Sequence, residues 1–280
     1  MFRRNQALRA WKLTMLLVIT ALMLSSCELT FSATQSPGTT VGSTVFALLR
    51  WRTQNNAIDV VFVPDDDYGD LSNVANRQVF LDDVANLIDE GYWQNNGLAN
   101  NLGLYNFWYM TLSGNAVAGT GICPNATWPN LTDAAFAEVI LLVHPNNLRD
   151  CRWGNRATTE PTSYNTVVHE SSHAMFNLPD EYCCDGGYRS MPPVLYISSA
   201  ACNADPVNAA WRNCQSYTAN NGTVWWRSED ATADIMSAAS ATVLEYGQAD
   251  WVIARNVLAG LPGAAVNDPT VFAPAAWDWP

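Results

Sequence analysis

The chain contains two histidines four residues apart with a glutamate directly after the first: His169, Glu170 and His173. Residues four apart lie on the same face of an α-helix, so both imidazoles would point to one place and bind the same Zn²⁺. A carboxylate beside that metal can accept a proton from metal-activated water, which makes Glu170 the candidate general base. The chain has only three His in all, so composition alone does not readily explain this spacing.

Residues 163–177 can form the helix that this spacing requires. Val167 and Val168 precede the first His and give the segment an apolar side suited to burial. Ser163 offers a capping hydroxyl at the helix start. Asn177 suits the helix end because it tolerates the left-handed backbone conformation. The sequence therefore predicts a buried helix with both histidines on one face.

The residues that follow carry a resemblance to a known family. The stretch 169–184 reads HESSHAMFNLPDEYCC. It resembles the IgA-peptidase-like zinc metallopeptidases, whose motif continues from the second His through Gly-Leu to Asp-Glu-Tyr. Here Asn177-Leu178 stands at the Gly-Leu place, and residues 180–182 match the triplet. The immune inhibitor A peptidases are also similar, but their triplet comes one residue earlier.

Two stretches upstream also resemble this family. Residues 58–63, followed by the acidic turn 65–68, are similar to its first strand and turn, with Asp67 in place of a Gly. Residues 104–108 are similar to its aromatic strand. The resemblance spans Ile58 to Ala259 and implies an α+β fold: a zincin (metzincin-like) catalytic domain. Such a domain has a twisted mixed sheet, an active-site helix and a loop-rich lower lobe.

A catalytic zinc usually has three protein ligands and one water, so the two histidines need a third partner. The resemblance favours the segment after the helix, where Asp180 and Glu181 follow His173 by seven and eight residues. Glu181 is preferred for its longer reach, with Asp180 as the alternative. The remaining histidine, His144, ends a predicted buried strand and is expected to be a hydrogen-bonded structural residue.

Residues 233–237, Ala-Asp-Ile-Met-Ser, resemble the Met-turn of metzincins, in which a Met forms an apolar floor beneath the metal. Met236 would be that residue, and ordinary core packing is the alternative. Residues 243–246 and 251–258 then predict a closing helix that ends at Gly260 and Pro262. The resemblance implies this order of active-site helix, loop, turn and closing helix.

The N-terminus predicts export and lipid attachment. Four basic residues precede an apolar run of 12 residues, Leu13–Leu24, which suits a signal peptide better than a membrane span. The run ends in Leu-Ser-Ser-Cys, which resembles the bacterial lipoprotein box with Cys27 as the lipidated residue. An ordinary secretory cleavage site is the alternative. No Asp retention signal follows Cys27, so we expect anchoring to the cell envelope, at the outer membrane where the organism has one.

Four regions follow from these features. They are a signal peptide at 1–26, a flexible tether at 27–44, a zinc metallopeptidase domain at 45–262 and a Pro- and Ala-rich tail at 263–280. Within the domain, apolar spacing predicts a helix over 76–87, and apolar runs predict strands at 58–63 and 139–143. After the metal-binding helix, loops are expected to dominate until Val243.

Cysteine usage agrees with export. Without Cys27, six cysteines remain, and an even number in an exported chain predicts disulfides. The six are Cys123, Cys151, Cys183, Cys184, Cys202 and Cys214. The first two are expected to pair, and the adjacent third and fourth are expected to reach the last two. Because no Cys-x-x-Cys occurs, a structural zinc–thiolate site is not expected.

The mature chain is strongly acidic. Residues 1–26 hold four basic and no acidic residues, so their removal leaves 10 basic and 26 acidic residues, a net charge of −16. Nucleic acid is therefore not an expected partner. The expected partners are a protein or peptide substrate and the membrane that receives the lipid anchor.

Together these features favour a zinc-dependent endopeptidase acting on extracellular or envelope proteins, with Glu170 as general base. The alternative from another class is a non-catalytic surface lipoprotein that uses a metzincin-like shell for binding. The intact His-Glu-x-x-His motif favours the enzyme. Zinc-dependent hydrolysis of a non-peptide amide or ester is a further alternative.

We predict that Cys27 carries lipid, because it ends the Leu-Ser-Ser-Cys box at the end of the short apolar run. Expression in a bacterial host with radiolabelled palmitate should give a labelled, membrane-associated protein. Cys27→Ser is the control and should stay unlabelled. A freely soluble, unlabelled wild-type product whose N-terminus is not Cys27 would contradict the anchor.

Overall fold

The computed structural model describes residues 29–33, 39–121, 123–181, 190–206, 214–219, 221–227, 234–237 and 243–270. The chain divides into residues 1–30 and a second unit, Phe31–Pro280, which contains all the elements described below. The predicted signal peptide and Cys27 lie outside the described residues, as do Cys183 and Cys184.

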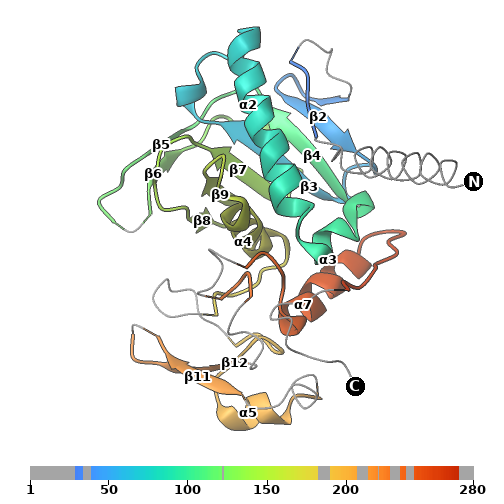
Figure 1. Ribbon diagram of the computed structural model, residues 1–280, viewed down its shortest axis with the longest axis vertical. Coiled ribbons are helices and arrows are strands. Elements are labelled where there is room, and N and C mark those ends of the chain that lie inside the picture. Colours follow the sequence, from blue (N-terminus) through green and yellow to red (C-terminus); the bar gives the residue numbers. More distant parts are fainter. Residues whose placement is uncertain are drawn as a thin grey trace, which may run out of the picture. The chain divides into compact units, whose positions relative to one another are not determined.

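A seven-stranded mixed sheet forms the centre of the second unit (Figure 1). Its strands, in spatial order, are β1 (Thr40–Val41), β2 (Val45–Arg50), β4 (Tyr105–Met110), β3 (Ile58–Pro64), β7 (Val139–Val143), β9 (Arg156–Thr159) and β8 (Arg152–Trp153). The four inner strands β4, β3, β7 and β9 are parallel, whereas β1, β2 and β8 are antiparallel to their neighbours. The prediction of an α+β fold with a mixed sheet is confirmed.

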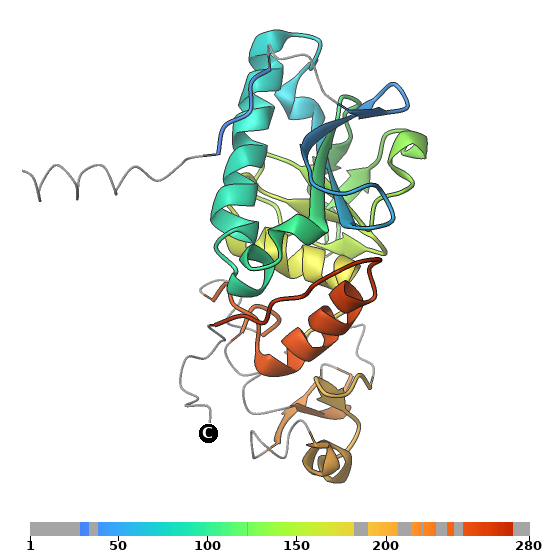
Figure 2. The same ribbon diagram turned by 90° about the vertical axis from the view of Figure 1, so that its right-hand side faces the viewer.

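The two faces of this sheet bury different side chains, because successive residues of a strand point to opposite sides. One face carries an apolar cluster, whose members on the strands are Val45, Val61, Val63, Trp108, Met110, Ile140 and Leu142. On the other face Phe62 stacks on Phe107, and Phe107 meets Tyr92 edge-on. The long helix α2 (Val74–Asn86) lies alongside the main sheet, as Figures 1 and 2 show.

The predicted elements before the metal-binding motif are confirmed. The strands expected at 58–63 and 139–143 are β3 and β7, and both are buried along their whole length, as inner parallel strands are. The helix expected at 76–87 is α2, which Asn73 caps through a hydrogen bond to the backbone of Ala75. Short elements complete this half. They are η1 (Asp66–Tyr68), η2 (Leu87–Tyr92), α3 (Asn96–Ala99), η3 (Leu102–Leu104), η4 (Thr132–Ala134) and the hairpin β5 (Asn115–Val117) with β6 (Asn125–Thr127).

The second half contains the motif helix α4 (Tyr164–Met175), close to its expected position, and the closing helix α7 (Gln248–Ala259). The expectation of helix at residues 243–246 is wrong, because the extended backbone of Gly247 lets the helix begin only at Gln248. Between α4 and α7 lies an element that the sequence did not predict. It is a small antiparallel sheet in the order β10 (Leu195–Tyr196), β12 (Val224–Arg227) and β11 (Gln215–Thr218), accompanied by α5 (Ser199–Ala204). These strands are too short and too irregular in polarity to give a period-two signal.

Two disulfides occur among the described cysteines. Cys123 bonds to Cys151, as expected. Cys202 bonds to Cys214, which corrects the expectation that these two pair with the adjacent cysteines further upstream. The reason is local: α5 carries Cys202 and leads towards β11, so only 12 residues separate the two partners.

The folded unit begins before residue 45. Thr40–Val41 pairs with β2, and the side chain of Gln78 in α2 bonds to the backbone of Phe31 and Ala33. The expected boundary between tether and domain therefore falls inside the first hairpin.

At the other end, α7 stops at Gly260, as expected. The chain then packs back on the domain, where the Asp268 carboxylate accepts hydrogen bonds from Trp251 and Arg255. The first part of the expected tail thus belongs to the fold. Among the described residues, no helix combines the length and apolar character that a membrane crossing requires.

Candidate metal centre

The motif helix α4 rests on β7, β9 and η2. The hydroxyl of Ser163 does not cap the helix as expected, but donates to the carboxylate of Glu160. After the helix, Asn177 takes the left-handed conformation that its sequence position predicted, with φ of 58°. The chain thereby turns back, so that Leu178 and Asp180 lie beside the two histidines.

His169, His173 and Asp180 form a compact group of three donor atoms. The two imidazole Nε2 atoms lie 3.1 Å apart. Asp180 Oδ1 lies 3.2 Å from Nε2 of His169 and 3.1 Å from Nε2 of His173. Both imidazoles are buried, and the Asp180 side chain is only 13% exposed.

Backbone carbonyls fix the proton positions on both imidazoles. Nδ1 of His169 lies 2.7 Å from the carbonyl oxygen of Ile235, and Nδ1 of His173 lies 2.6 Å from that of Leu178. A carbonyl oxygen can only accept, so each Nδ1 carries a proton, and Nε2 is the nitrogen that offers a lone pair whenever the ring is neutral. The two Nε2 atoms and a carboxylate oxygen face one another, an arrangement that a positive charge between them stabilises, either a proton or a metal cation.

The donor atoms and their spacing fit zinc. Neutral imidazole nitrogen and carboxylate oxygen bind catalytic zinc at about 2.0–2.2 Å, which in a tetrahedron separates the ligand atoms by roughly 3.3–3.6 Å. The separations of 3.1 and 3.2 Å in this group are close to those values. His169, His173 and Asp180 could therefore hold a zinc ion, and this group alone among the described candidates combines imidazole with carboxylate donors.

The side chain of Glu181 belongs to a different group of acidic residues. Its side chain is fully buried with those of Asp234 and Asp250, and one carboxylate oxygen of each lies within 4.8 Å of the others. The backbone N–H of Glu181 donates to the carbonyl of Met236, which directs this residue towards the turn below the helix. The geometry thus favours Asp180 over Glu181 as the third ligand, the reverse of the preference based on reach alone.

The turn Asp234–Ser237 holds His169 in its orientation. The Asp234 carboxylate accepts from the N–H of Met236, and the Ser237 hydroxyl bonds to both backbone polar groups of Asp234. These bonds hold the turn whose Ile235 carbonyl orients His169. Met236 is fully buried in this turn. Its role as an apolar floor stays a prediction.

The two serines inside the motif fix the rotation of α4. Ser171 Oγ lies 2.5 Å from the Tyr92 hydroxyl. Ser172 Oγ donates to the carbonyl of Val168 and lies 2.6 Å from the Tyr246 hydroxyl. All these hydroxyls are buried. By helical spacing, Ser171 lies opposite the two histidines and Ser172 lies to one side of them, so the two contacts together fix which side of α4 faces the metal group. The sequence carried no signal for these pairs, because their partners lie 79 and 74 residues away.

Electrostatics around the three donors favour a positive charge between them. Burial alone would raise the pKa of Asp180, but its contacts with His169 and His173 hold that pKa well below the usual range. Burial alone would lower the pKa of His169, but Asp180 and Glu170 raise it to about 9. An ionised Asp180 beside buried imidazoles is the environment that a cation stabilises.

Glu170 is buried beside this group. Burial raises the pKa of its carboxyl, the two histidines lower it, and the negative charges of Asp180 and Asp150 add to the rise. A general base works best when its pKa lies near the working pH, so a raised pKa suits the role expected of Glu170.

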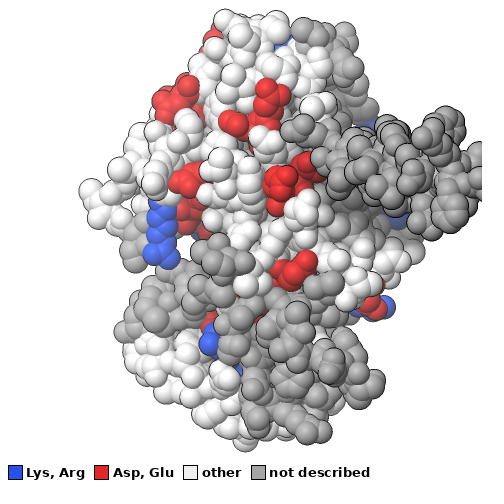
Figure 3. Space-filling view, viewed as in Figure 1, with Lys and Arg blue, Asp and Glu red and all other residues white. Residues whose placement is uncertain are grey.

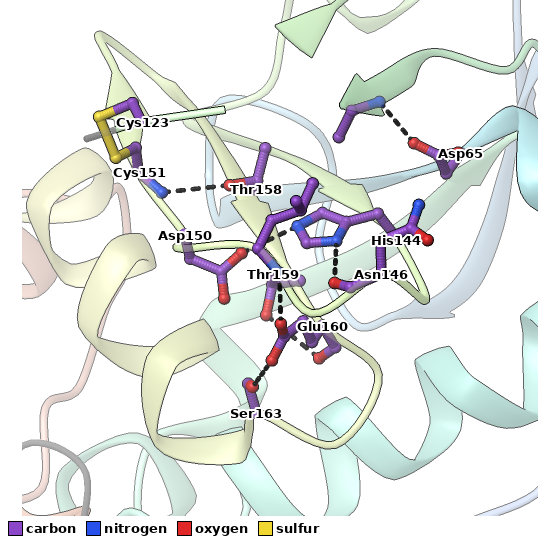
Figure 4. A network of polar contacts seen from close by, with 12 residues as sticks. Asp65, Cys123, His144, Asn146, Asp150, Cys151, Thr158, Thr159, Glu160 and Ser163 are labelled. Atoms are coloured by element: carbon purple, nitrogen blue, oxygen red, sulfur yellow. Dashed lines mark hydrogen bonds and ion pairs between the residues drawn. A yellow bond between two sulfur atoms is a disulfide. The ribbon is translucent and has the colours of Figure 1, made fainter. Parts of the chain in front are cut away.

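The third histidine is structural, as expected. His144 is fully buried, with Nδ1 at 2.9 Å from the carbonyl of Asn146 and Nε2 at 3.0 Å from Asp150 Oδ1 (Figure 4). Burial lowers the pKa of His144, but the hydrogen bond and charge of Asp150 outweigh it, and the net change is upward. Both ring nitrogens are thus engaged away from the metal group.

No protein-family model matches this chain, and neither does any curated protein sequence.

We predict that the His144–Asp150 pair stabilises the protein less as the pH rises. Because the folded-state pKa of His144 is raised, its contribution is full below the unfolded-state value of about 6.5 and is lost through the higher folded-state pKa. Urea unfolding of the wild type and Asp150→Asn from about pH 5 to pH 9 measures it. The difference in unfolding free energy should be largest at the acidic end. Asp268→Asn, in the exposed pair with Arg255, is the control, and an Asp150→Asn difference independent of pH would contradict the assignment.

Proposed function

We propose that this protein is a zinc-dependent endopeptidase, exported and lipid-anchored, that hydrolyses peptide bonds of extracellular or envelope proteins. The observation that carries the proposal is the group of His169, His173 and Asp180, whose donor atoms lie 3.1–3.2 Å apart with Glu170 buried beside them. The two disulfides suit an exported domain.

The chain's own residues would hold the metal and keep it in place. Zinc, when bound at such a site, supplies a Lewis acid that polarises a carbonyl and lowers the pKa of water. His169 and His173 bind through Nε2, because the carbonyls of Ile235 and Leu178 fix their tautomer. Such hydrogen bonds to the second ring nitrogen also orient metal-binding imidazoles and make them more basic.

Glu170 moves the proton. Its carboxylate accepts a proton from the water that attacks the peptide carbonyl, and the resulting carboxyl passes that proton to the leaving amine nitrogen. The raised pKa of the buried Glu170 carboxyl favours its use in both transfers. A buried carboxylate beside three metal donors has no evident use in a protein that only binds, so this arrangement favours catalysis over the non-catalytic alternative.

The surface charge supports a protein or peptide substrate. Acidic side chains are spread over the face in Figure 3, where basic ones are few. Residues 27–280 carry a net charge of −16, which repels nucleic acid phosphates. Peptides with basic residues would be drawn to this surface, most strongly at low ionic strength.

We predict about one zinc per chain in the purified protein. His169→Ala, His173→Ala and Asp180→Ala should each lose most of it, because each removes one of three donors. Glu181→Gln is the matched carboxylate control and should keep its zinc, since Glu181 faces the turn. Elemental analysis after dialysis gives the ratio. Equal zinc in all five proteins would contradict this site.

We predict that Glu170→Gln keeps its zinc but cleaves peptides at least ~10²-fold more slowly, the usual scale for removing a general base. The change preserves size and removes only the basic oxygen. A peptide library with zinc content measured in parallel tests it. Glu90→Gln, on η2, is the control and should cleave like the wild type. Full activity in Glu170→Gln would refute this mechanism.

A further inference from the structure

Of the three proposed metal ligands, Asp180 is the one that lies outside helix α4. His169 and His173 belong to α4 and are fixed by helical backbone bonds, whereas Asp180 follows the helix in an irregular segment. A metal ligand on irregular chain needs contacts from elsewhere to stay within reach of the metal. The contacts of residues 180–181 therefore show what completes the site.

Two side chains of the small sheet hold this segment by its carbonyls. Arg227 Nη1 on β12 donates to the carbonyl of Glu181. The hydroxyl of Tyr217 on β11 donates to the carbonyl of Asp180 at 3.5 Å. The Arg227 guanidinium also lies over the Tyr217 ring, 5.3 Å from its centroid, a cation–π contact.

The register of the two strands explains why these side chains meet. Arg227 pairs with Gln215 across the β11–β12 ladder, and Tyr217 lies two residues further along β11. Positions two apart share a face, so Arg227 and Tyr217 are diagonal neighbours whose long side chains can touch. Together their polar groups contact the backbone of residues 180–181.

The small sheet has support of its own. Its central strand β12 pairs with β10 on one side and with β11 on the other. The Cys202–Cys214 disulfide joins α5 to the residue directly before β11. From the other direction, the carbonyl of Met236 accepts the N–H of Glu181. The ligand segment thus lies between the small sheet and the turn that also orients His169.

We propose that Arg227 and Tyr217 are positioning residues that hold Asp180 in its metal-binding place. This inference rests on the metal site of the proposed function and adds the part of the fold that completes it. Both act through the backbone of residues 180–181, whose carbonyls accept their hydrogen bonds.

The test measures metal binding by the full-length protein and uses no substrate. Zinc affinity is obtained by competition with a chromophoric chelator, and the visible absorption spectrum of the cobalt-substituted protein reports the geometry of the ligands. Arg227→Gln should weaken zinc binding by about 10- to 100-fold, the usual cost of losing an outer contact, and alter the cobalt spectrum. Arg227→Lys should recover part of the affinity, because it keeps the charge and a donor.

Tyr217→Phe separates the hydroxyl from the ring. It keeps the ring under Arg227 and removes the hydroxyl that bonds to Asp180, so it should weaken zinc binding less than Arg227→Gln does. Arg156→Gln is the matched control, because Arg156 lies over the Trp128 ring at 5.7 Å on the main sheet. It should bind zinc and cobalt like the wild type.

Wild-type zinc affinity and an unchanged cobalt spectrum in Arg227→Gln would overturn the proposal. Should that variant fail to fold, wild-type values in both Arg227→Lys and Tyr217→Phe would overturn it equally. The proposed function fails in a different way: a wild-type protein that binds zinc and cleaves no peptide would refute peptidase activity and leave the positioning result intact.

Discussion

Two hydrogen bonds from imidazoles to backbone carbonyls control the geometry of the whole site. The carbonyls of Ile235 and Leu178 accept the Nδ1 protons of His169 and His173, and so direct both Nε2 lone pairs to one point. The helix alone only puts the two rings on one side. The tautomer and ring orientation depend on a turn and a loop that lie 66 and five residues away in sequence. The irregular half of the domain therefore builds the site as much as α4 does.

Hydrogen bonds through Glu245 connect the turn Asp234–Ser237 to the short helix α3. The N–H of Ile235 donates to the carbonyl of Glu245, whose carboxylate accepts the N–H of Asn96 at the start of α3. The hydroxyl of the next residue, Tyr246, is hydrogen-bonded with the Ser172 hydroxyl on α4. Burial raises the pKa of Glu245 to about 7, although the bond from Asn96 opposes the rise. One short stretch thus connects α3, the turn and the motif helix, so a shift in any of them moves a metal donor.

Regular elements were predictable from the sequence because their signals are local. The apolar runs of β3 and β7, the spacing of α2 and the left-handed Asn177 each depend on residues within one element. The choice between Asp180 and Glu181 was not predictable, because it depends on contacts of these two residues with Tyr217, Arg227 and Met236, which lie far along the chain. The small sheet was missed because its strands have two to four residues and owe their stability to pairing across the chain.

Several buried carboxylates lie around the proposed metal site, and their negative charge needs compensation. Glu170, Asp180, Glu181, Asp234 and Asp250 bring five carboxylates into one largely buried region. Burying a charge costs free energy unless an opposite charge or hydrogen bonds compensate it. At the three donor atoms a proton on His169, whose pKa Asp180 and Glu170 raise to about 9, supplies that compensation, and a bound metal cation would take its place. Metal binding at such a group releases repulsion between its donors, so part of the binding free energy stabilises the fold. At the proposed site, metal binding would therefore stabilise together the segment that Arg227 contacts and the turn that holds His169.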